Sequence, residues 1–204
     1  MLHNEVSRFI WTSVGLISVF AGLQIWLIDK GAFGLFTISR VLSAISIVLF
    51  FWSLFAIWLW QFLPFSLIAK RPVLKGTWGG HIYSKWSPEG EIDKETKIPI
   101  YFAIYQDFFK ITIRSFTEGK EGITLSAHLI RNNDTHEFTI IYVYTLNHPF
   151  DSTMPVQRGA AIVRLVDNRL KGNYWTDTNS KGIVVVEFQK KKREASYHHA
   201  SRTR

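Results

Sequence analysis

Residues 159–188 read GAAIVRLVDNRLKGNYWTDTNSKGIVVVEF and contain three short runs rich in β-branched and aromatic residues. Such runs, bounded by Asn, Asp, Ser and Gly, are typical of β-strands. The dipeptide Asp167-Asn168 predicts a two-residue hairpin turn, because both residues tolerate positive φ. The stretch therefore predicts consecutive antiparallel strands that pair as neighbours.

The same pattern extends back along the chain to Gly76 and predicts an antiparallel all-β domain without helices. Eight short strands with close turns favour an up-and-down, lipocalin-like β-barrel, whose interior is filled by side chains or holds one small ligand. A β-sandwich is the alternative architecture. The expected strands are 76–84, 97–106, 108–116, 122–130, 136–146, 158–166, 169–176 and 182–189.

Alternation within a strand predicts which side chains face the interior. In 169–176, Leu170 and Tyr174 share the expected inner face, and Trp175 lies on the outer one. Trp78, which follows Gly76-Thr77 at the start of the first strand, is expected to plug the closed end of the barrel.

The first 69 residues have a different character. The runs 9–28 and 41–63 are apolar and uncharged. Crossing a ~30 Å hydrocarbon core takes about 20 apolar residues in a helix, so the runs predict two transmembrane helices in an antiparallel hairpin. Run 9–28 is too long for the apolar region of a signal peptide. More basic residues flank the outer helix ends than the loop, which places both termini in the cytoplasm.

The positive charge of the chain is concentrated at its end. Residues 190–204 hold six basic residues and one acidic residue, whereas the total for the chain is +8. A nucleic-acid-binding domain would carry this charge on its folded part, so DNA and RNA are not expected partners. We expect 70–189 to be the barrel and 190–204 to be a disordered basic tail. Attraction to anionic lipid is an alternative role for the tail.

The sequence lacks the common signatures of catalysis. It contains no cysteine, no G-x-S-x-G or H-E-x-x-H motif and no phosphate-binding loop motif. The histidines show no spacing typical of metal ligands. We therefore expect no enzyme activity, no metal and no cofactor.

One end of the expected barrel carries residues suited to ligand binding. Aromatic rings stack on bases, an arginine binds phosphate in a bidentate manner, and threonine and aspartate can bind ribose or base. This combination predicts a nucleotide-like ligand. Alternatively, Tyr174 fills the core and Arg158 is merely exposed. The candidate ligand-binding residues are Arg158, Tyr174, Thr176, Asp177 and Tyr144.

Two motifs behind the apolar pair carry a resemblance to a known family: LKGTWGG at 74–80, and L-x-G-x-Y-W-T-D at 170–177 with a following Gly182. With them the chain, apart from its tail, resembles the two-transmembrane, β-strand-rich effectors of bacterial CBASS antiphage defence. The resemblance implies a barrel that binds a cyclic di- or oligonucleotide made by a partner CD-NTase. It further implies oligomerisation through the membrane helices, disruption of the inner membrane and death of the infected cell.

Three functions follow from these observations. The leading hypothesis is a non-enzymatic effector in the bacterial inner membrane, activated by a cyclic oligonucleotide as its ligand. The second is a membrane-tethered carrier of a lipid or another hydrophobic ligand. The third is a membrane-bound hydrolase, which the absence of nucleophile and metal motifs disfavours.

Overall fold

The computed structural model describes residues 2–28, 35–62, 71–86, 94–132, 134–149 and 153–201. The chain divides into two compact units, residues Met1–Ala69 and Lys70–Arg204. The first is helical and the second is a β-barrel. Each is described by itself.

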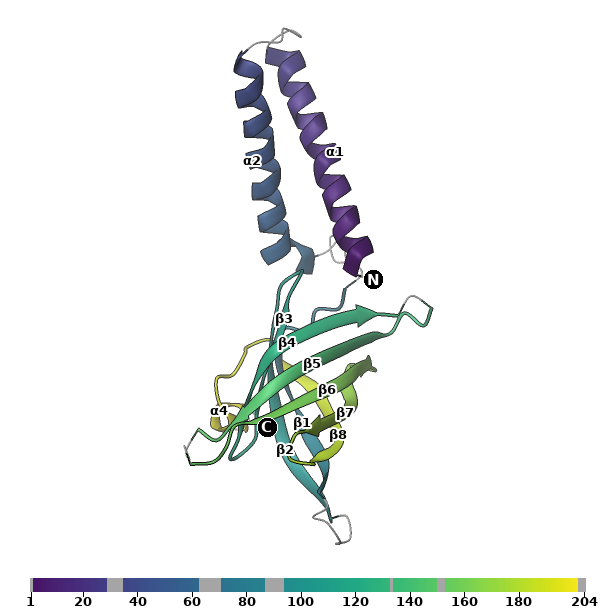
Figure 1. Ribbon diagram of the computed structural model, residues 1–204, viewed down its shortest axis with the longest axis vertical. Coiled ribbons are helices and arrows are strands. Elements are labelled where there is room, and N and C mark those ends of the chain that lie inside the picture. Colours follow the sequence, from purple (N-terminus) through teal and green to yellow (C-terminus); the bar gives the residue numbers. More distant parts are fainter. Residues whose placement is uncertain are drawn as a thin grey trace. The chain divides into compact units, whose positions relative to one another are not determined.

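The first unit contains two helices that pack along each other (Figure 1), α1 (Leu2–Ile28) and α2 (Leu35–Ile57), followed by the short 3-10 helix η1 (Leu59–Gln61). Ala21, Ala44 and Val48 are buried, whereas many larger apolar side chains are exposed. Within the described residues, no helix proves long and apolar enough to cross a membrane. The predicted pair of helices therefore forms, but the prediction that they span a membrane is not supported.

The second unit is a closed barrel of eight antiparallel strands in which each strand pairs with its neighbours in sequence and β1 pairs with β8 (Figure 1). This confirms the antiparallel eight-stranded barrel over the sandwich. The strands are β1 (Gly76–Trp86), β2 (Lys94–Gln106), β3 (Ile111–Phe116), β4 (Glu121–Arg131), β5 (Phe138–Asn147), β6 (Gln157–Val166), β7 (Arg169–Thr176) and β8 (Lys181–Lys190).

Turn chemistry sets two of the strand boundaries. Asp167 and Asn168 have φ of 49° and 60°, which confirms the predicted tight hairpin between β6 and β7. Strand β3 begins later than predicted because Asp107 caps the preceding turn. Its Oδ1 accepts hydrogen bonds from the backbone N–H groups of Phe109 at 2.8 Å and Lys110 at 2.6 Å, so these residues belong to the turn.

Alternation along the strands is as predicted. In β7, Leu170 is fully buried and Tyr174 nearly so, whereas Trp175 is 47% exposed. At Gly172, on the inner face between them, an added Cβ would lie 1.9 Å from the carbonyl oxygen of Ile162 on β6. Such a close approach of two backbones requires glycine, and glycines of this kind let a sheet curve tightly into a barrel.

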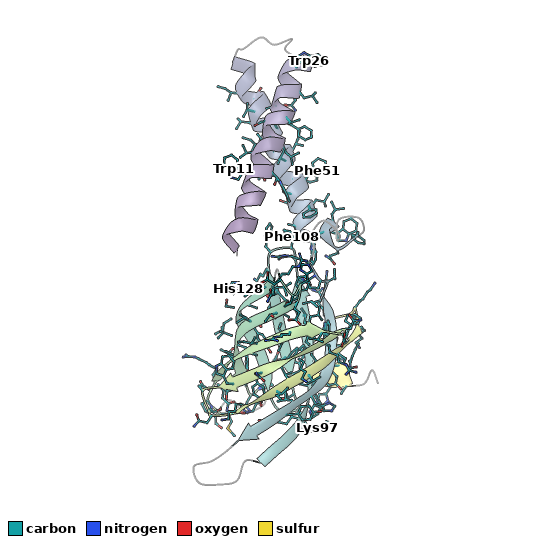
Figure 2. All side chains as sticks on the ribbon, turned by 90° about the vertical axis from the view of Figure 1, so that its right-hand side faces the viewer. Trp11, Trp26, Phe51, Lys97, Phe108 and His128 are labelled. Atoms are coloured by element: carbon teal, nitrogen blue, oxygen red, sulfur yellow. The ribbon has the colours of Figure 1, made fainter. Side chains whose placement is uncertain are left out.

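One end of the barrel is closed by side chains. Trp78 is buried, as predicted, and its indole N–H donates to the carbonyl of Leu74 at 2.8 Å. Buried Gln106 accepts a hydrogen bond from the N–H of Leu74 at 2.7 Å and donates to the carbonyl of Pro72 at 2.9 Å. The chain entering β1 is thus hydrogen-bonded across this end. Figure 2 places Phe108 toward the same end and Lys97 toward the other.

The basic tail differs from the expected disordered extension, because residues up to 201 lie against the barrel. The hydroxyl of Thr77 donates to the carbonyl of Lys192 at 2.7 Å and accepts from the N–H of Glu194 at 3.0 Å. Arg193 lies over the ring of Tyr105, and α4 (Tyr197–Ser201) places Tyr197 edge-on to a tyrosine of β2. Hydrogen bonds and ring contacts therefore outweigh the mutual repulsion of the basic residues.

The carboxylate of Glu194 is part of this attachment. It lies 2.8 Å from the ammonium of Lys190 and 3.8 Å from that of Lys192. The hydrogen bond with Lys190, helped by the attraction of Lys192, holds the pKa of Glu194 below its ordinary value of 4.5. The tail is therefore attached to the barrel more strongly when the carboxyl group of Glu194 is ionised than when it is neutral.

We predict that Glu194→Gln lowers the free energy of unfolding above pH 4.5. A depressed pKa contributes stability above the ordinary value, and this contribution disappears as pH falls through the depressed pKa. Wild type and variant should therefore converge in strong acid. Chemical unfolding of the full chain at several pH values measures the difference, with Asp134→Asn in an exposed turn as the control. A difference that does not change with pH would contradict this role.

Candidate functional site

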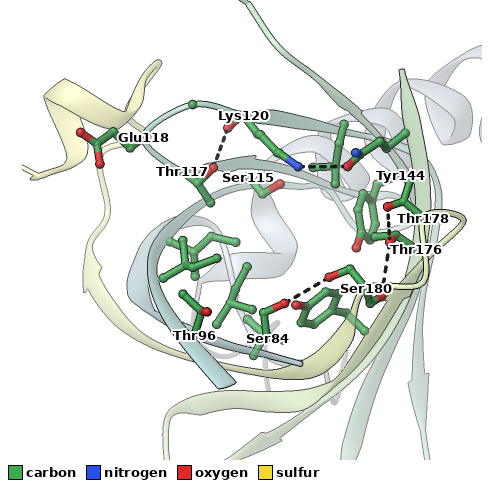
Figure 3. Close-up of a pocket in the computed structure, with 18 of the residues that line it drawn as sticks. Ser84, Thr96, Ser115, Thr117, Glu118, Lys120, Tyr144, Thr176, Thr178 and Ser180 are labelled. Carbon is green, nitrogen blue, oxygen red and sulfur yellow. Dashed lines mark hydrogen bonds between the residues drawn. The ribbon is translucent and has the colours of Figure 1, made fainter. Parts of the chain in front are cut away.

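A cavity of about 540 Å³ opens at the end of the barrel opposite Trp78. Its walls come from the inner faces of β1, β2, β3, β5, β6, β7 and β8, and its mouth from the turns between β3 and β4 and between β7 and β8 (Figure 3). Small-molecule sites in proteins are about 300–1,000 Å³ in volume. The cavity is therefore large enough for one small ligand.

Three tyrosines form one wall of the cavity, Tyr142, Tyr144 and Tyr174. The rings of Tyr142 and Tyr144 are 5.5 Å apart between centroids and tilted by 38°. Burial raises the pKa of both phenols far above the ordinary value of 10.0, and the nearby phenol of Tyr174 raises that of Tyr144 further. Tyr142 and Tyr144 therefore remain protonated at neutral pH and can act as hydrogen-bond donors.

A set of hydroxyl groups surrounds the mouth. Several are already hydrogen-bonded to each other, Ser84 to Ser180 at 3.1 Å and Thr176 to Thr178 at 3.0 Å (Figure 3). Hydroxyls both donate and accept, so they can bind phosphate, ribose or base atoms without a fixed charge. The set is Ser84, Thr96, Ser115, Thr117, Thr176, Thr178 and Ser180.

Few charged groups line this cavity. Its described lining contains Glu118, Lys120 and His148. The ammonium of Lys120 donates to the side-chain oxygen of Gln157 at 3.1 Å, which holds it across the mouth. An anionic ligand would therefore meet one lysine and many neutral donors, with no arginine among the described lining residues.

Below the hydroxyls the cavity becomes apolar. Ile98, Ile100, Phe102 and Val184 line this deeper part, and the last three are buried. Phe102 packs edge-on to Tyr142, with centroids 6.4 Å apart. A flat, partly apolar group such as a base would be accommodated here between aromatic and aliphatic surfaces.

The structure brings together three of the five residues predicted from the sequence. Tyr144, Tyr174 and Thr176 line the cavity, and Arg158 and Asp177 do not. Asp177 instead closes the end of the β6–β7 ladder: its carboxylate accepts from the N–H of Arg158 at 3.0 Å, and its own N–H donates to the Arg158 carbonyl at 2.9 Å. Ligand contact by any of the five remains a prediction.

Strand alternation explains the placement of Arg158 and also the residues that sequence reasoning missed. Gly159 faces the interior, so Arg158 beside it faces outward and is exposed. Ser84 lies on the same face of β1 as Trp78. The two-residue alternation of the strand could therefore have predicted that it faces the interior. Lys120 lies in a hairpin, where no periodicity indicates a direction.

The closed barrel and its cavity define a β-barrel with an internal small-ligand site. A family model described as Cap15, cyclic dinucleotide receptor domain, matches residues 69–190. The match covers more than half of the chain and all eight strands, so the chain belongs to this family. The resemblance found in the sequence is thereby confirmed for the barrel. A search of curated proteins yields no match.

Gly159 makes room for the tyrosine wall. A Cβ at this position would lie 2.6 Å from the ring carbon Cζ and the hydroxyl oxygen of Tyr144, and 2.8 Å from the carbonyl oxygen of Trp175. Any side chain at position 159 would therefore push Tyr144 from its place.

We predict that Gly159→Ala lowers the free energy of unfolding by about 1–3 kcal/mol, because overpacking forces side chains and backbone to shift. Gly119→Ala is the matched control: its Cβ would meet nothing within 4 Å, and its effect should stay within about 0.5 kcal/mol. Urea unfolding of the full chain measures both. Equal stability of the two variants would show that Tyr144 is not held against Gly159.

Proposed function

We propose that the chain is a CBASS effector whose barrel binds a cyclic dinucleotide in the cavity. The observation that carries the proposal is a ligand-sized cavity with a tyrosine wall and a hydroxyl-rich mouth, in a chain of the cyclic dinucleotide receptor family. In this proposal the barrel senses the signal and performs no chemistry on it.

The lining suits the parts of such a ligand. Bases stack on aromatic rings with about 1–3 kcal/mol per base, and Tyr142, Tyr144 and Tyr174 offer these surfaces. The hydroxyls and Lys120 are suited to the phosphates and sugars. Because most of these groups are neutral, hydrogen bonds rather than ion pairs would supply most of the recognition.

The apolar depth of the cavity favours a second candidate, a carrier of a lipid or another hydrophobic ligand. Ile98, Ile100 and Val184 would contact an acyl chain. An acyl chain would form no hydrogen bonds with the hydroxyls at the mouth. A ligand panel that contains both chemical classes separates the two functions.

The effector step is assigned to the helices. We propose that α1 and α2 act on the bacterial inner membrane, that oligomerisation through them follows ligand binding, and that membrane damage kills the infected cell. Support comes from large exposed apolar side chains on both helices, including Trp11, Trp26, Phe50 and Ile57. Apolar surface on this scale calls for an apolar partner. A CD-NTase would supply the activating nucleotide.

Ligand binding should raise the melting temperature of the full chain in mild detergent. A ligand at a hundred times its Kd stabilises the folded state by about 2.7 kcal/mol. We expect at least one cyclic dinucleotide of a panel to do so, and free fatty acids to have no effect. Tyr174→Leu should weaken nucleotide binding about 5- to 150-fold, which corresponds to the loss of one stacking contact.

Trp175→Leu is the matched control for Tyr174→Leu, since Trp175 is the next residue of β7 and points outward. It should bind the nucleotide as the wild type does. Stabilisation by fatty acids alone would favour the carrier. Equal weakening by both substitutions would place the ligand outside the cavity.

The membrane step predicts release of a trapped dye from liposomes that contain the full chain, on addition of the cyclic dinucleotide that stabilises it. Trp175→Leu should release dye at the same nucleotide concentration as the wild type. Tyr174→Leu should require more, because its affinity is lower. Nucleotide binding without dye release would leave the sensor intact and overturn the membrane step.

A further inference from the structure

The barrel is closed by very unequal ladders. Most neighbouring strands pair over seven or more residues, but β3 and β4 share only Arg114↔Ile123, Ser115↔Gly122 and Phe116↔Glu121. Beyond these pairs β4 continues with β5 as a long hairpin (Figure 1). The barrel therefore has a seam along which two adjacent strands separate.

Local chemistry ends the β3–β4 ladder. The hydroxyl of Thr124 donates to the carbonyl of Ile113 at 2.6 Å and lies 3.1 Å from its N–H, so a side chain replaces the next backbone pair. A β-bulge follows between Thr124 and Ser126 in the pairing with β5. Bulges bend a strand and re-aim it, which directs the rest of β4 away from β3.

Ser126–Arg131 consequently forms a sheet edge. These six residues pair with β5, and among the residues that the structure describes no other strand pairs with them. Free edges present unpaired N–H and C=O groups, and proteins usually protect them with lysine, proline or a covering segment. This stretch contains neither lysine nor proline. It is therefore a template for another strand.

We propose that this edge pairs with the same edge of a second copy of the chain, as an antiparallel dimer with a two-fold axis close to His128. A two-fold contact is closed, because each copy covers this same edge of the other. The proposal concerns a surface of the barrel wall, distinct from the cavity and from the helices.

The residue pattern of the edge is self-complementary. In a two-fold antiparallel pair, residues on the same face meet, so His128 lies opposite itself or diagonal to itself, and Ser126 and Ile130 lie beside it on the exposed face. Ala127 and Leu129 then meet on the inner face, where they already pack against the core. The one formal charge, on Arg131, lies at the end of the edge and over its own hairpin residue Phe138. No two fixed charges therefore meet.

A single cysteine near the two-fold axis tests the pairing directly, because the chain has no cysteine of its own. Cα atoms of directly opposite or diagonal residues lie about 4.5–8 Å apart. We therefore expect full-chain His128→Cys to form a covalent dimer with a short bismaleimide. Asn173→Cys, exposed on the outer face of β7, should remain monomeric on the same gel. Equal yields from the two variants would overturn the proposal.

Charge substitutions at the same position supply an independent test. Like charges at the axis weaken a pair, and opposite charges support it, so His128→Glu and His128→Lys should each raise the dimer dissociation constant about two- to fivefold. An equimolar mixture of the two should recover wild-type dimerisation in analytical ultracentrifugation. His128 is exposed, so both variants should melt like the wild type.

The outcomes are distinct from those of the nucleotide experiments. Recovery in the mixture establishes the self-paired edge whether or not a nucleotide binds. Weakening by both charges without recovery would mean that a different partner strand covers the edge. Dimers that neither substitution affects would place the contact elsewhere, and a wild type that is monomeric throughout would overturn the proposal.

Discussion

Closure of the sheet by the pairing of β1 with β8 is the constraint on which the rest of this structure depends. The ladder runs from Thr77↔Lys190 to Lys85↔Lys181 and joins the first strand to the last. Once the sheet is closed, every second side chain points into a confined interior, and the others form the wall. The interior must then be filled by side chains or remain as a cavity. In this barrel side chains fill the end near Trp78, and the opposite end holds the cavity.

The closed end of the barrel contributes to stability, and the open end offers the candidate binding site. At the closed end Trp78 and Gln106 hydrogen-bond the entering chain, so buried polar backbone groups have partners. At the open end the inner faces carry hydroxyls and phenols that retain capacity for a ligand. Buried donors and acceptors cost free energy when left unpaired, and the hydroxyl of buried Ser84 is accordingly bonded to that of Ser180.

The seam between β3 and β4 is the second consequence of closure. A barrel tolerates one short ladder because the remaining ladders hold the sheet together. At this seam Thr124 pairs with the backbone of Ile113, and the bulge turns β4 outward. The same local feature ends one ladder and exposes a long edge of β4. A surface for a second strand thus arises without any loss of the cavity.

The sequence by itself determined the strands, their order, the Asp167-Asn168 turn and the faces of Leu170, Tyr174 and Trp175, because alternation and turn chemistry are local properties. It also determined the two apolar helices, but not what surrounds them. Only the tertiary structure decided that Ser84 meets Ser180, that Thr77 binds the tail near Glu194, and that Asp177 caps Arg158 rather than facing the cavity. These contacts join residues 19 to 117 positions apart, and no local pattern records which distant partner the closed barrel will place beside each side chain.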